Sequence, residues 1–239
     1  MSAPDRPEVR PVPPWALGVG RFLSRGVWKA EVVGLEHVPT SGPVILAANH
    51  TGVVDGPLVA GVVPRGVHML VKEAAFVGPV GRFLHASGNI PVDSFGGRRA
   101  LASSMEVLRR GDVVGIFPEG NRGRGDAAVA FAGVAWLAVN AAVPVVPVAV
   151  LGTRRTGESV GHVPRPRRRI AIEFGEALHL ERQTGLAGRQ AIAHANESIR
   201  TALAVLVAGA SARTGIVLPT DDPNREPPPP PSRKGRRRD

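Results

Sequence analysis

The amino-acid sequence predicts a single α/β domain in which helices cover a central, mostly parallel or mixed β-sheet. Three observations support this prediction. The chain has 239 residues, 43% of them hydrophobic, which is enough for one sizeable core. Short runs rich in valine and isoleucine alternate with segments in which apolar residues recur at helical spacing. Proline-rich and arginine-rich ends flank this alternating region, so we expect the domain to span residues 30–218.

In the first half of the domain, turn-forming residues separate short apolar runs. These runs predict strands at 32–34, 44–48 and 67–71, and an extended segment at 89–92. The turn between the first two strands is expected over 39–43, where prolines flank a glycine. A helix is expected over 56–63, because Asp55 can cap its N-terminus and Pro57 is tolerated in its first turn. Residues 76–86 are expected to be helical or irregular.

The second half of the domain has longer apolar segments. They predict helices at 98–110, 127–142 and 188–209, and strands at 112–117, 145–151 and 170–174. The helix over 98–110 has the clearest pattern, because Leu101, Met105 and Leu108 share one face and Gly111 can end it. Alternating strands and helices place their connecting loops at the ends of strands, where α/β folds carry their chemistry.

Three segments outside the domain have a different character. Residues 1–14 contain five prolines and are expected to form a disordered leader. Residues 15–29 predict a short amphipathic helix with a tryptophan near each end. This helix can pack on the core or lie in a lipid interface, where tryptophan and arginine are favoured, and we expect membrane contact. Residues 219–239, with a proline run and an arginine cluster, are expected to form a disordered tail.

The composition excludes several classes of function. Without cysteine, disulfides, cysteine–zinc sites and a thiol nucleophile are impossible. No apolar run reaches the roughly 18 to 20 uncharged residues of a spanning helix, and the N-terminus lacks the basic-then-apolar order of a secretory signal, so we expect an intracellular protein. The net charge of +10 favours an anionic partner. Aromatic residues make up only 4%, without tyrosine, which favours an anionic membrane surface over nucleic acid.

The first motif with chemical potential is the segment 49–56, Asn-His-Thr-Gly-Val-Val-Asp-Gly, which directly follows a predicted buried strand. The Thr-Gly pair lets the backbone turn, so Asp55 can return to the imidazole of His50. A carboxylate there fixes the tautomer of a histidine and stabilises its protonated form, as a general base requires. The alternative is a histidine at the end of a strand and an aspartate that only caps a helix.

The second motif is the segment 117–124, Phe-Pro-Glu-Gly-Asn-Arg-Gly-Arg, which also follows an apolar strand. Its glycines allow close approach of the backbone, and Arg122 can bind two phosphate oxygens side by side. Glu119 can position Arg122 or a substrate hydroxyl. The alternative is an ordinary surface loop with a salt bridge. Together, the two motifs predict an enzyme that activates a hydroxyl on a substrate bearing a phosphate.

Four ordered blocks resemble the glycerolipid acyltransferase family, whose best-known members are the lysophosphatidic acid acyltransferases. The blocks are NHTGVVDG, VKEAAFVGPVGRFLHASGNIPVD, IFPEGNRGRG and VPVVPVAVLGT. The resemblance as a whole runs from about Gly34 to Thr153, roughly half of the chain. The resemblance implies that His50 and Asp55 are the catalytic pair.

The resemblance also implies the substrate-binding residues. Glu119, Gly120 and Arg122 match the block that binds the phosphate of the acyl acceptor, and Lys72 is a further candidate for contact with an anion. The Val-Pro-x-x-Pro block matches 143–147 and is expected to shape the acyl site.

The chain departs from the family pattern at several positions. The block that ends in arginine in the family is followed here by Ser94, so Arg98 or Arg99 can replace that arginine, or the acceptor differs from lysophosphatidate. Milder departures place small or polar residues at Gly52, Asn121 and Gly123. The change at Ser94 concerns the identity of the substrate rather than the class of reaction.

The activity that the resemblance implies is transfer of a fatty acyl group to the hydroxyl of 1-acyl-glycerol-3-phosphate, giving phosphatidic acid for phospholipid biosynthesis. The donor is expected to be acyl-CoA or acyl-carrier protein, and neither a cofactor nor a metal is expected. We expect a peripheral protein at the cytoplasmic face of the cell membrane. Alternative functions are acyl transfer to another lysolipid or a glycolipid, and lipid binding without catalysis.

Overall fold

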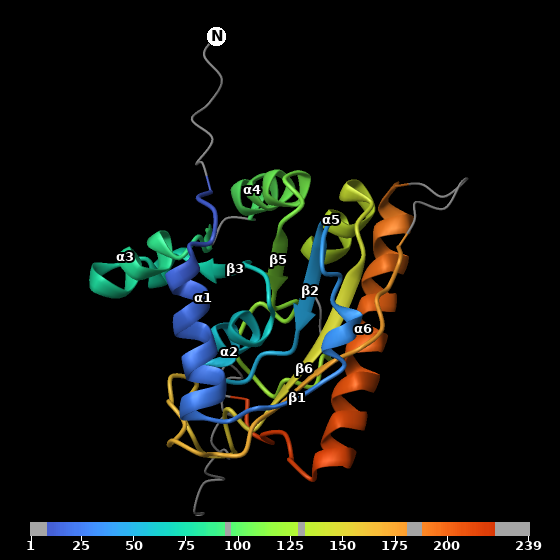
Figure 1. Ribbon diagram of the computed structural model, residues 1–239. Helices are drawn as coiled ribbons and strands as arrows, with labels where there is room; N and C mark the ends of the chain where they lie inside the picture. The colour runs from blue at the N-terminus through green and yellow to red at the C-terminus, as the bar shows by residue number, and fades with distance from the viewer. Residues whose placement is uncertain (1–8, 94–96, 129–131, 181–187, 223–239) are drawn as a thin grey trace, which may run out of the picture.

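A computed structural model describes residues 9–93, 97–128, 132–180 and 188–222. These residues form one seven-stranded sheet with helices packed against it (Figure 1). The strands are β1 (Glu31–Val33), β2 (Val44–Ala48), β3 (Val67–Lys72), β4 (Ile90–Val92), β5 (Val113–Ile116), β6 (Val145–Leu151) and β7 (Ala171–Phe174). The α-helices are α1 (Pro14–Arg21), α2 (Asp55–Val62), α3 (Gly78–Ala86), α4 (Arg98–Arg109), α5 (Gly133–Ala141) and α6 (Gly188–Thr214). Short helical segments lie at Phe22–Val27, Leu35–His37 and Glu73–Ala75.

The sheet is parallel except at one junction. Its strand order is β1-β7-β6-β2-β5-β3-β4. The five strands from β6 to β4 run parallel to one another, β7 is antiparallel to β6, and β1 is parallel to β7. The predicted fold class, a mostly parallel mixed sheet in one α/β domain, is therefore confirmed.

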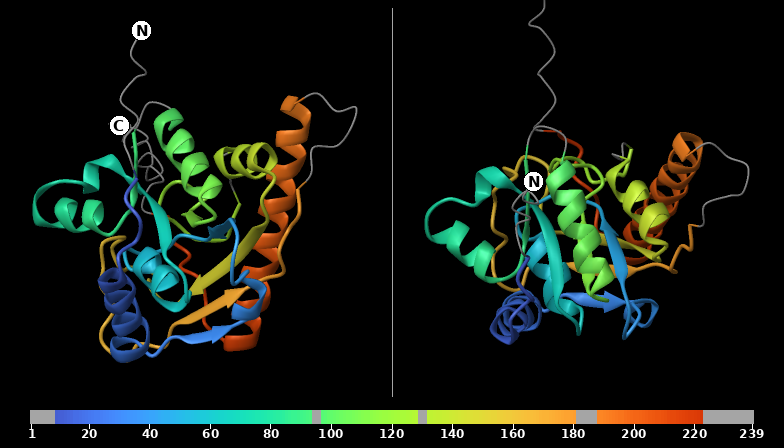
Figure 2. Two further views of the ribbon diagram at one scale, coloured as in Figure 1. Left: turned by 45° about the horizontal axis from the view of Figure 1, so that its top comes forward. Right: turned by 90° about the horizontal axis from the view of Figure 1, so that it is seen from above.

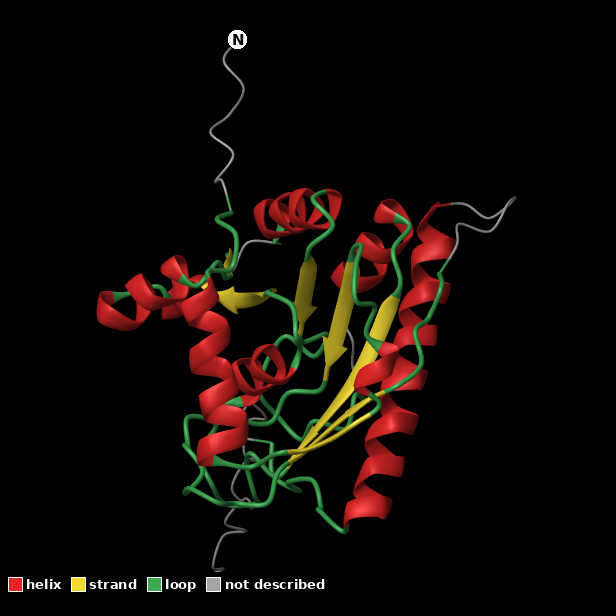
Figure 3. Ribbon diagram, in the orientation of Figure 1, coloured by secondary structure: helices red, strands yellow, loops and turns green. Residues whose placement is uncertain are grey.

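Strand β2 lies at the centre of the sheet, and both of its faces are buried. Val44 and Leu46 contribute to a cluster that contains Leu58 of α2. Ile45 points to the opposite cluster, which contains Leu137 of α5 together with residues of α4 and α6. Side chains of a strand alternate between the two faces, so a strand covered on both sides must be apolar throughout. Helices accordingly flank the strands on both sides (Figure 3).

Some expected boundaries were wrong. Ala127 has a positive φ of 53°, which is incompatible with a helix, and α5 begins only at Gly133. Helix α6 continues five residues beyond the expected end at Gly209, to Thr214. The segment expected to be helical or irregular contains α3, which projects beside the edge of the sheet in the views of Figure 2.

Both terminal segments are partly packed, which corrects two expectations of disorder. Val9 is buried, and its carbonyl accepts a hydrogen bond of 2.8 Å from Arg110 Nη1, so residues 9–13 belong to the folded part of the predicted leader. At the other end, Pro219 is buried and Asp221 contacts Arg154. The rest of both predicted segments, 1–8 and 223–239, lies outside the described residues. Among the residues described, we find no helix that is long and apolar enough to cross a membrane.

Candidate active site

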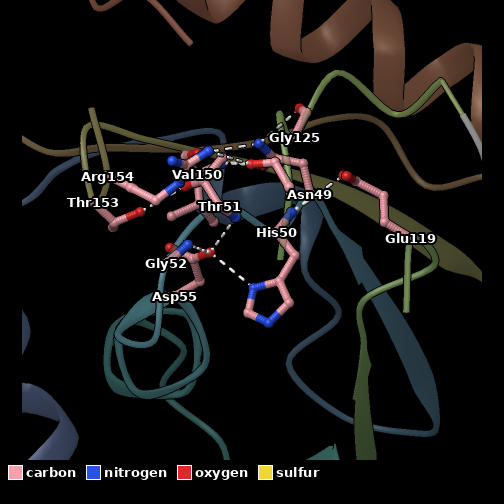
Figure 4. A network of polar contacts seen from close by, with 11 residues as sticks. Asn49, His50, Thr51, Gly52, Asp55, Glu119, Gly125, Val150, Thr153 and Arg154 are labelled. Atoms are coloured by element: carbon pink, nitrogen blue, oxygen red, sulfur yellow. Dashed lines mark hydrogen bonds and ion pairs between the residues drawn. The ribbon is translucent and has the colours of Figure 1, made fainter. Parts of the chain in front are cut away.

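The candidate site lies where neighbouring parallel strands end. The carboxyl ends of β2, β5 and β6 meet at one edge of the sheet, because these strands are adjacent and parallel. Strand β2 leads to His50, β5 leads to the loop of residues 117–126, and β6 leads to Thr153 (Figure 4). This edge is where open α/β sheets place ligands. The two motifs predicted from sequence are thus brought together, although they lie far apart in the chain.

The first motif forms a histidine–aspartate pair. His50 Nδ1 lies 2.9 Å from Asp55 Oδ2. The same oxygen accepts hydrogen bonds from the backbone N–H groups of Thr51 at 2.7 Å and Gly52 at 2.9 Å. An ionised carboxylate can only accept, so the proton of the neutral imidazole lies on Nδ1 and the lone pair on Nε2.

Asp55 does not cap α2 as expected. It is the first residue of the helix, Val54 precedes it as the N-cap, and the carboxylate turns back to the 51–52 backbone. The carboxylate is fully buried, but the positive end of the α2 dipole and three N–H donors compensate its charge. Hydrogen bonds to a single oxygen, Oδ2 of Asp55, therefore fix the conformation of the segment from His50 to Asp55.

The imidazole of His50 is held in place but remains accessible. Its ring stacks on Phe117, with 3.8 Å between ring centroids and 12° between planes. Its side chain is 12% exposed. Figure 4 shows the second ring nitrogen directed away from Asp55. This nitrogen can accept a proton from a bound hydroxyl.

A buried asparagine, which sequence reasoning did not select, anchors the end of β2. Asn49 Oδ1 accepts the N–H of Val150 at 2.6 Å, and its Nδ2 donates to the carbonyls of Val150 at 3.2 Å and Gly125 at 3.0 Å. Asn49 thereby joins β2, β6 and the 117–126 loop. A polar residue at the end of a buried strand was the available signal, because buried amides need partners.

Glu119 links the 117–126 loop to the histidine. Its Oε1 accepts the backbone N–H of His50 at 3.2 Å. Burial raises the pKa of Glu119 to about 7, and the nearby charges of Asp126 and Asp55 act in the same direction, against the hydrogen bonds from His50 and Gly125. A carboxyl group with such a pKa exchanges its proton near neutral pH.

The remaining residues of the predicted phosphate block lie in the same loop. Gly120 has a φ of 70°, a left-handed conformation that favours glycine, and it turns the chain after Glu119. Arg122 is half-buried. Lys72, at the end of β3, donates through Nζ to Oδ1 of Asn121. The loop that contacts the backbone of His50 therefore contains Arg122 and a glycine turn, and Lys72 binds to the same loop.

Arg98 and Arg99 are not placed with this group. Both are exposed on the first turn of α4, which follows β4 at the edge of the sheet. Strand β4 lies three positions from β2, or about 14 Å at the usual strand spacing. Ser94 lies outside the described residues. Part of the expected acyl-site block is in β6, where Val145 and Pro147 are buried.

The residues that follow β6 were also missed by sequence reasoning. Thr153 is buried, and its Oγ1 lies 2.8 Å from Oγ1 of Thr51 in the histidine loop. Arg154 is buried as well, and its Nη2 donates to the carbonyl of Gly123 at 3.0 Å. Among the described residues, no group of three or more histidine, aspartate or glutamate side chains could hold a metal ion.

Comparison with known proteins gives consistent results. The family described as Acyltransferase matches residues 29–151. A 1-acyl-sn-glycerol-3-phosphate acyltransferase of Bacillus subtilis (strain 168) is 28% identical over 187 residues, which cover 77% of this chain and 89% of that protein. A 1-acyl-sn-glycerol-3-phosphate acyltransferase beta of Homo sapiens is 33% identical over 116 residues, or 44% of this chain and 40% of the human protein.

Among solved structures, the fold resembles that of the 1-acyl-sn-glycerophosphate (LPA) acyltransferase PlsC from Thermotoga maritima. The TM-score is 0.62 at 22% sequence identity, and the match covers 84% of this chain and 78% of that one. This likeness concerns the arrangement of the strands and helices.

Proposed function

The chain belongs to the acyltransferase family of lipid biosynthesis, as its sequence motifs predicted, and from this premise we propose that it transfers a fatty acyl group to the hydroxyl of 1-acyl-glycerol-3-phosphate. The observation that carries the proposal is the hydrogen-bonded pair of His50 and Asp55, at the same sheet edge as a loop with an arginine and a glycine turn. The donor is acyl-CoA or acyl-carrier protein, and the product is phosphatidic acid.

In the proposed reaction, Nε2 of His50 removes the proton from the acceptor hydroxyl. The hydroxyl oxygen attacks the thioester carbonyl carbon, and a tetrahedral oxyanion forms. Asp55 stabilises the imidazolium, because its carboxylate accepts a hydrogen bond from the Nδ1–H group, with 2.9 Å between Nδ1 and Oδ2. When the oxyanion collapses, the carbon–sulfur bond breaks and the thiolate takes the proton from Nε2. The acyl group has then moved to the acceptor, and His50 is neutral again.

Recognition of the acceptor falls to the cations beside this pair. Arg122 can bind two phosphate oxygens through its guanidinium group, and Lys72 adds a point charge at the same loop. Glu119 is directed at the backbone of His50, so its proposed role is to connect the loop to the histidine rather than to contact the phosphate. Arg98 and Arg99 remain candidates for contact with a more distant part of the acceptor.

The test measures thiol release from oleoyl-CoA with matched acceptors. We expect turnover with 1-acyl-glycerol-3-phosphate and at least about tenfold less with monoacylglycerol, which differs by the absent phosphate and forms no charge-assisted hydrogen bonds. Equal turnover with both acceptors would contradict the proposed phosphate recognition. Turnover only with a lysophospholipid of another headgroup, or with a glycolipid, would support the alternative acceptor. No turnover with any pair would favour a lipid-binding protein.

We further propose that the protein docks peripherally on the cytoplasmic face of the cell membrane. Six exposed apolar residues, here called the α1–α3 patch, lie on α1, at the start of the helical segment after it, just before α3, and on α3: Trp15, Val19, Phe22, Val77, Val80 and Phe83. The rings of Trp15 and Phe83 are 5.4 Å apart, which makes the patch continuous across the two helices.

Charge and position support a membrane as the partner of this patch. Arg21, Arg25 and Arg82 are exposed beside the apolar residues and suit an anionic lipid surface. Helix α3 follows β3 after one short helical turn, and β3 ends at Lys72, next to the 117–126 loop. A bilayer against the patch would therefore bring lysolipid close to the candidate site.

Vesicle co-sedimentation tests this surface. Phe22→Ser combined with Val80→Ser should weaken binding to vesicles of phosphatidylglycerol and phosphatidylcholine by about tenfold or more, because each apolar side chain contributes on the order of 1.5 to 3 kcal/mol when buried. The matched control is Val205→Ser, which removes an equally exposed valine from α6. Equal weakening by the control and the double variant would contradict the proposal.

A further inference from the structure

Arg154 is a buried cation that connects three segments at the candidate site. Its side chain has no exposed surface. Nη2 donates to the carbonyl of Gly123 and to the carbonyl of Asp221, at 3.0 and 2.9 Å. Nη1 donates to Oδ2 of Asp221 at 2.9 Å and to the carbonyl of Glu158 at 3.0 Å. One guanidinium thus ties the 117–126 loop to the turn after β6 and to the segment that follows α6.

The segment after α6 lies against the 117–126 loop. Pro219 is buried, and the backbone N–H of Thr220 donates to Thr156 Oγ1 at 3.1 Å. A Cβ atom on Gly123 would lie 3.5 Å from the carboxylate of Asp222, so the segment packs directly on this glycine. Burial acts to raise the pKa of Asp221, but the hydrogen bond from Arg154 and the charge of that guanidinium help to bring the pKa below its usual value.

Gly123 is held from both sides. Its N–H donates to the carbonyl of His50 at 3.0 Å, while its carbonyl accepts from Arg154. Arg122, which carries the proposed phosphate contact, directly precedes Gly123, which carries the contact with Arg154. A buried arginine that loses its carboxylate partner keeps an uncompensated charge, which destabilises its present position. Movement at Arg154 would displace Gly123 and, with it, the guanidinium of Arg122.

We propose that Arg154 and Asp221 are positioning residues that fix the 117–126 loop for binding the acceptor phosphate. The segment 219–222 is then part of the acceptor site, although it lies more than 90 residues beyond the loop in the sequence. This inference depends on the proposed function, because it assigns a support to the proposed phosphate contact.

Steady-state kinetics of Asp221→Asn tests the inference. The variant keeps the shape of the side chain and removes its charge. We expect KM for 1-acyl-glycerol-3-phosphate to rise about tenfold, because a small displacement of a binding group costs much of its contribution. KM for oleoyl-CoA and kcat should stay within about twofold of the wild-type values, because Asp55 and the ring of Phe117 hold the imidazole of His50 independently of Gly123. Glu197→Gln, which removes a carboxylate paired with Arg200 on the exposed face of α6, is the matched control.

Amide hydrogen exchange separates positioning from a general loss of stability. In Asp221→Asn, exchange should accelerate at residues 120–125 and remain unchanged in β2 and β5, whereas global destabilisation would accelerate both. An unchanged acceptor KM in Asp221→Asn, with normal wild-type turnover, would overturn this inference and leave the proposed function intact. A wild-type protein that neither binds nor acylates 1-acyl-glycerol-3-phosphate would overturn the proposed function, and the inference with it.

Discussion

Replacing Glu119 with glutamine tests the electrostatics of the carboxyl group behind His50. Burial and the negative charges of Asp126 and Asp55 raise the pKa of Glu119 from 4.5 to about 7. Glutamine has nearly the same shape and keeps a carbonyl oxygen that can accept the N–H of His50. Glu119→Gln therefore removes the titration and preserves the contact that is 3.2 Å long in the wild-type protein.

The size of the effect on stability follows from the difference between the pKa values of Glu119 in the folded and unfolded states. The folded protein binds the carboxyl proton of Glu119 more tightly than the unfolded chain does. The stabilisation that this proton gives is therefore fully present below the unfolded pKa of 4.5 and is lost as pH rises through about 7. At about 1.36 kcal/mol for each pH unit, Glu119 should lower the free energy of unfolding by about 2 kcal/mol between about pH 5.5 and about pH 8.5.

The assay is urea unfolding of the wild-type protein and Glu119→Gln across that pH range. Other titrating groups affect both proteins, so the difference between their two curves isolates Glu119. We expect the wild-type protein to lose about 2 kcal/mol more than the variant on going to high pH. Parallel curves would refute the reasoning, because they would mean that Glu119 has the same pKa in the folded and unfolded states.

Three further predictions follow from the site. Asp55→Asn should lower kcat about 10³-fold or more, with little change in either KM, because the imidazolium loses its counter-charge. A decrease in kcat of less than about tenfold, measured as thiol release from oleoyl-CoA, would contradict a role for Asp55 in the chemical step. Lys72→Ala should raise the acceptor KM about fivefold and leave the donor KM unchanged, whereas replacement of the exposed Arg189 of α6 with alanine should change neither. Equal effects of both variants would indicate only an effect of net charge. Deletion of 223–239, which spares Asp221, should weaken binding to anionic vesicles in a salt-sensitive manner. Unchanged vesicle binding with lost oligonucleotide binding would instead assign the tail to nucleic acid.

The sequence was sufficient to predict the elements that have strong local patterns. The β2 run Val44–Ala48 and the helix beginning at Arg98 were predicted at their observed starts, because burial on both faces and helical spacing leave clear signatures. The expected helix over 127–142 was too long. An alanine-rich run favours a helix in any local count, but tertiary contacts hold Ala127 in a left-handed conformation that local propensity cannot reveal.

The site was predictable where its residues belong to one of the two motifs. The spacing of His50 and Asp55 allowed a contact between them, and the family resemblance implied that they form a pair. The additional hydrogen bonds of the carboxylate to the 51–52 backbone require the loop geometry. Asn49 and Arg154 could not be assigned, because their partners Val150 and Asp221 lie 101 and 67 residues away. Such pairings depend on strand order, which a single sequence does not specify.

The central claim is that His50 takes the proton from the acceptor hydroxyl. The most direct measurement is mass-spectrometric detection of phosphatidic acid formed from oleoyl-CoA and 1-acyl-glycerol-3-phosphate, comparing His50→Ala with His194→Ala, the same substitution at an exposed histidine of α6. We predict wild-type amounts of product with His194→Ala and at least about 10³-fold less with His50→Ala. Comparable product from the two variants would contradict the claim.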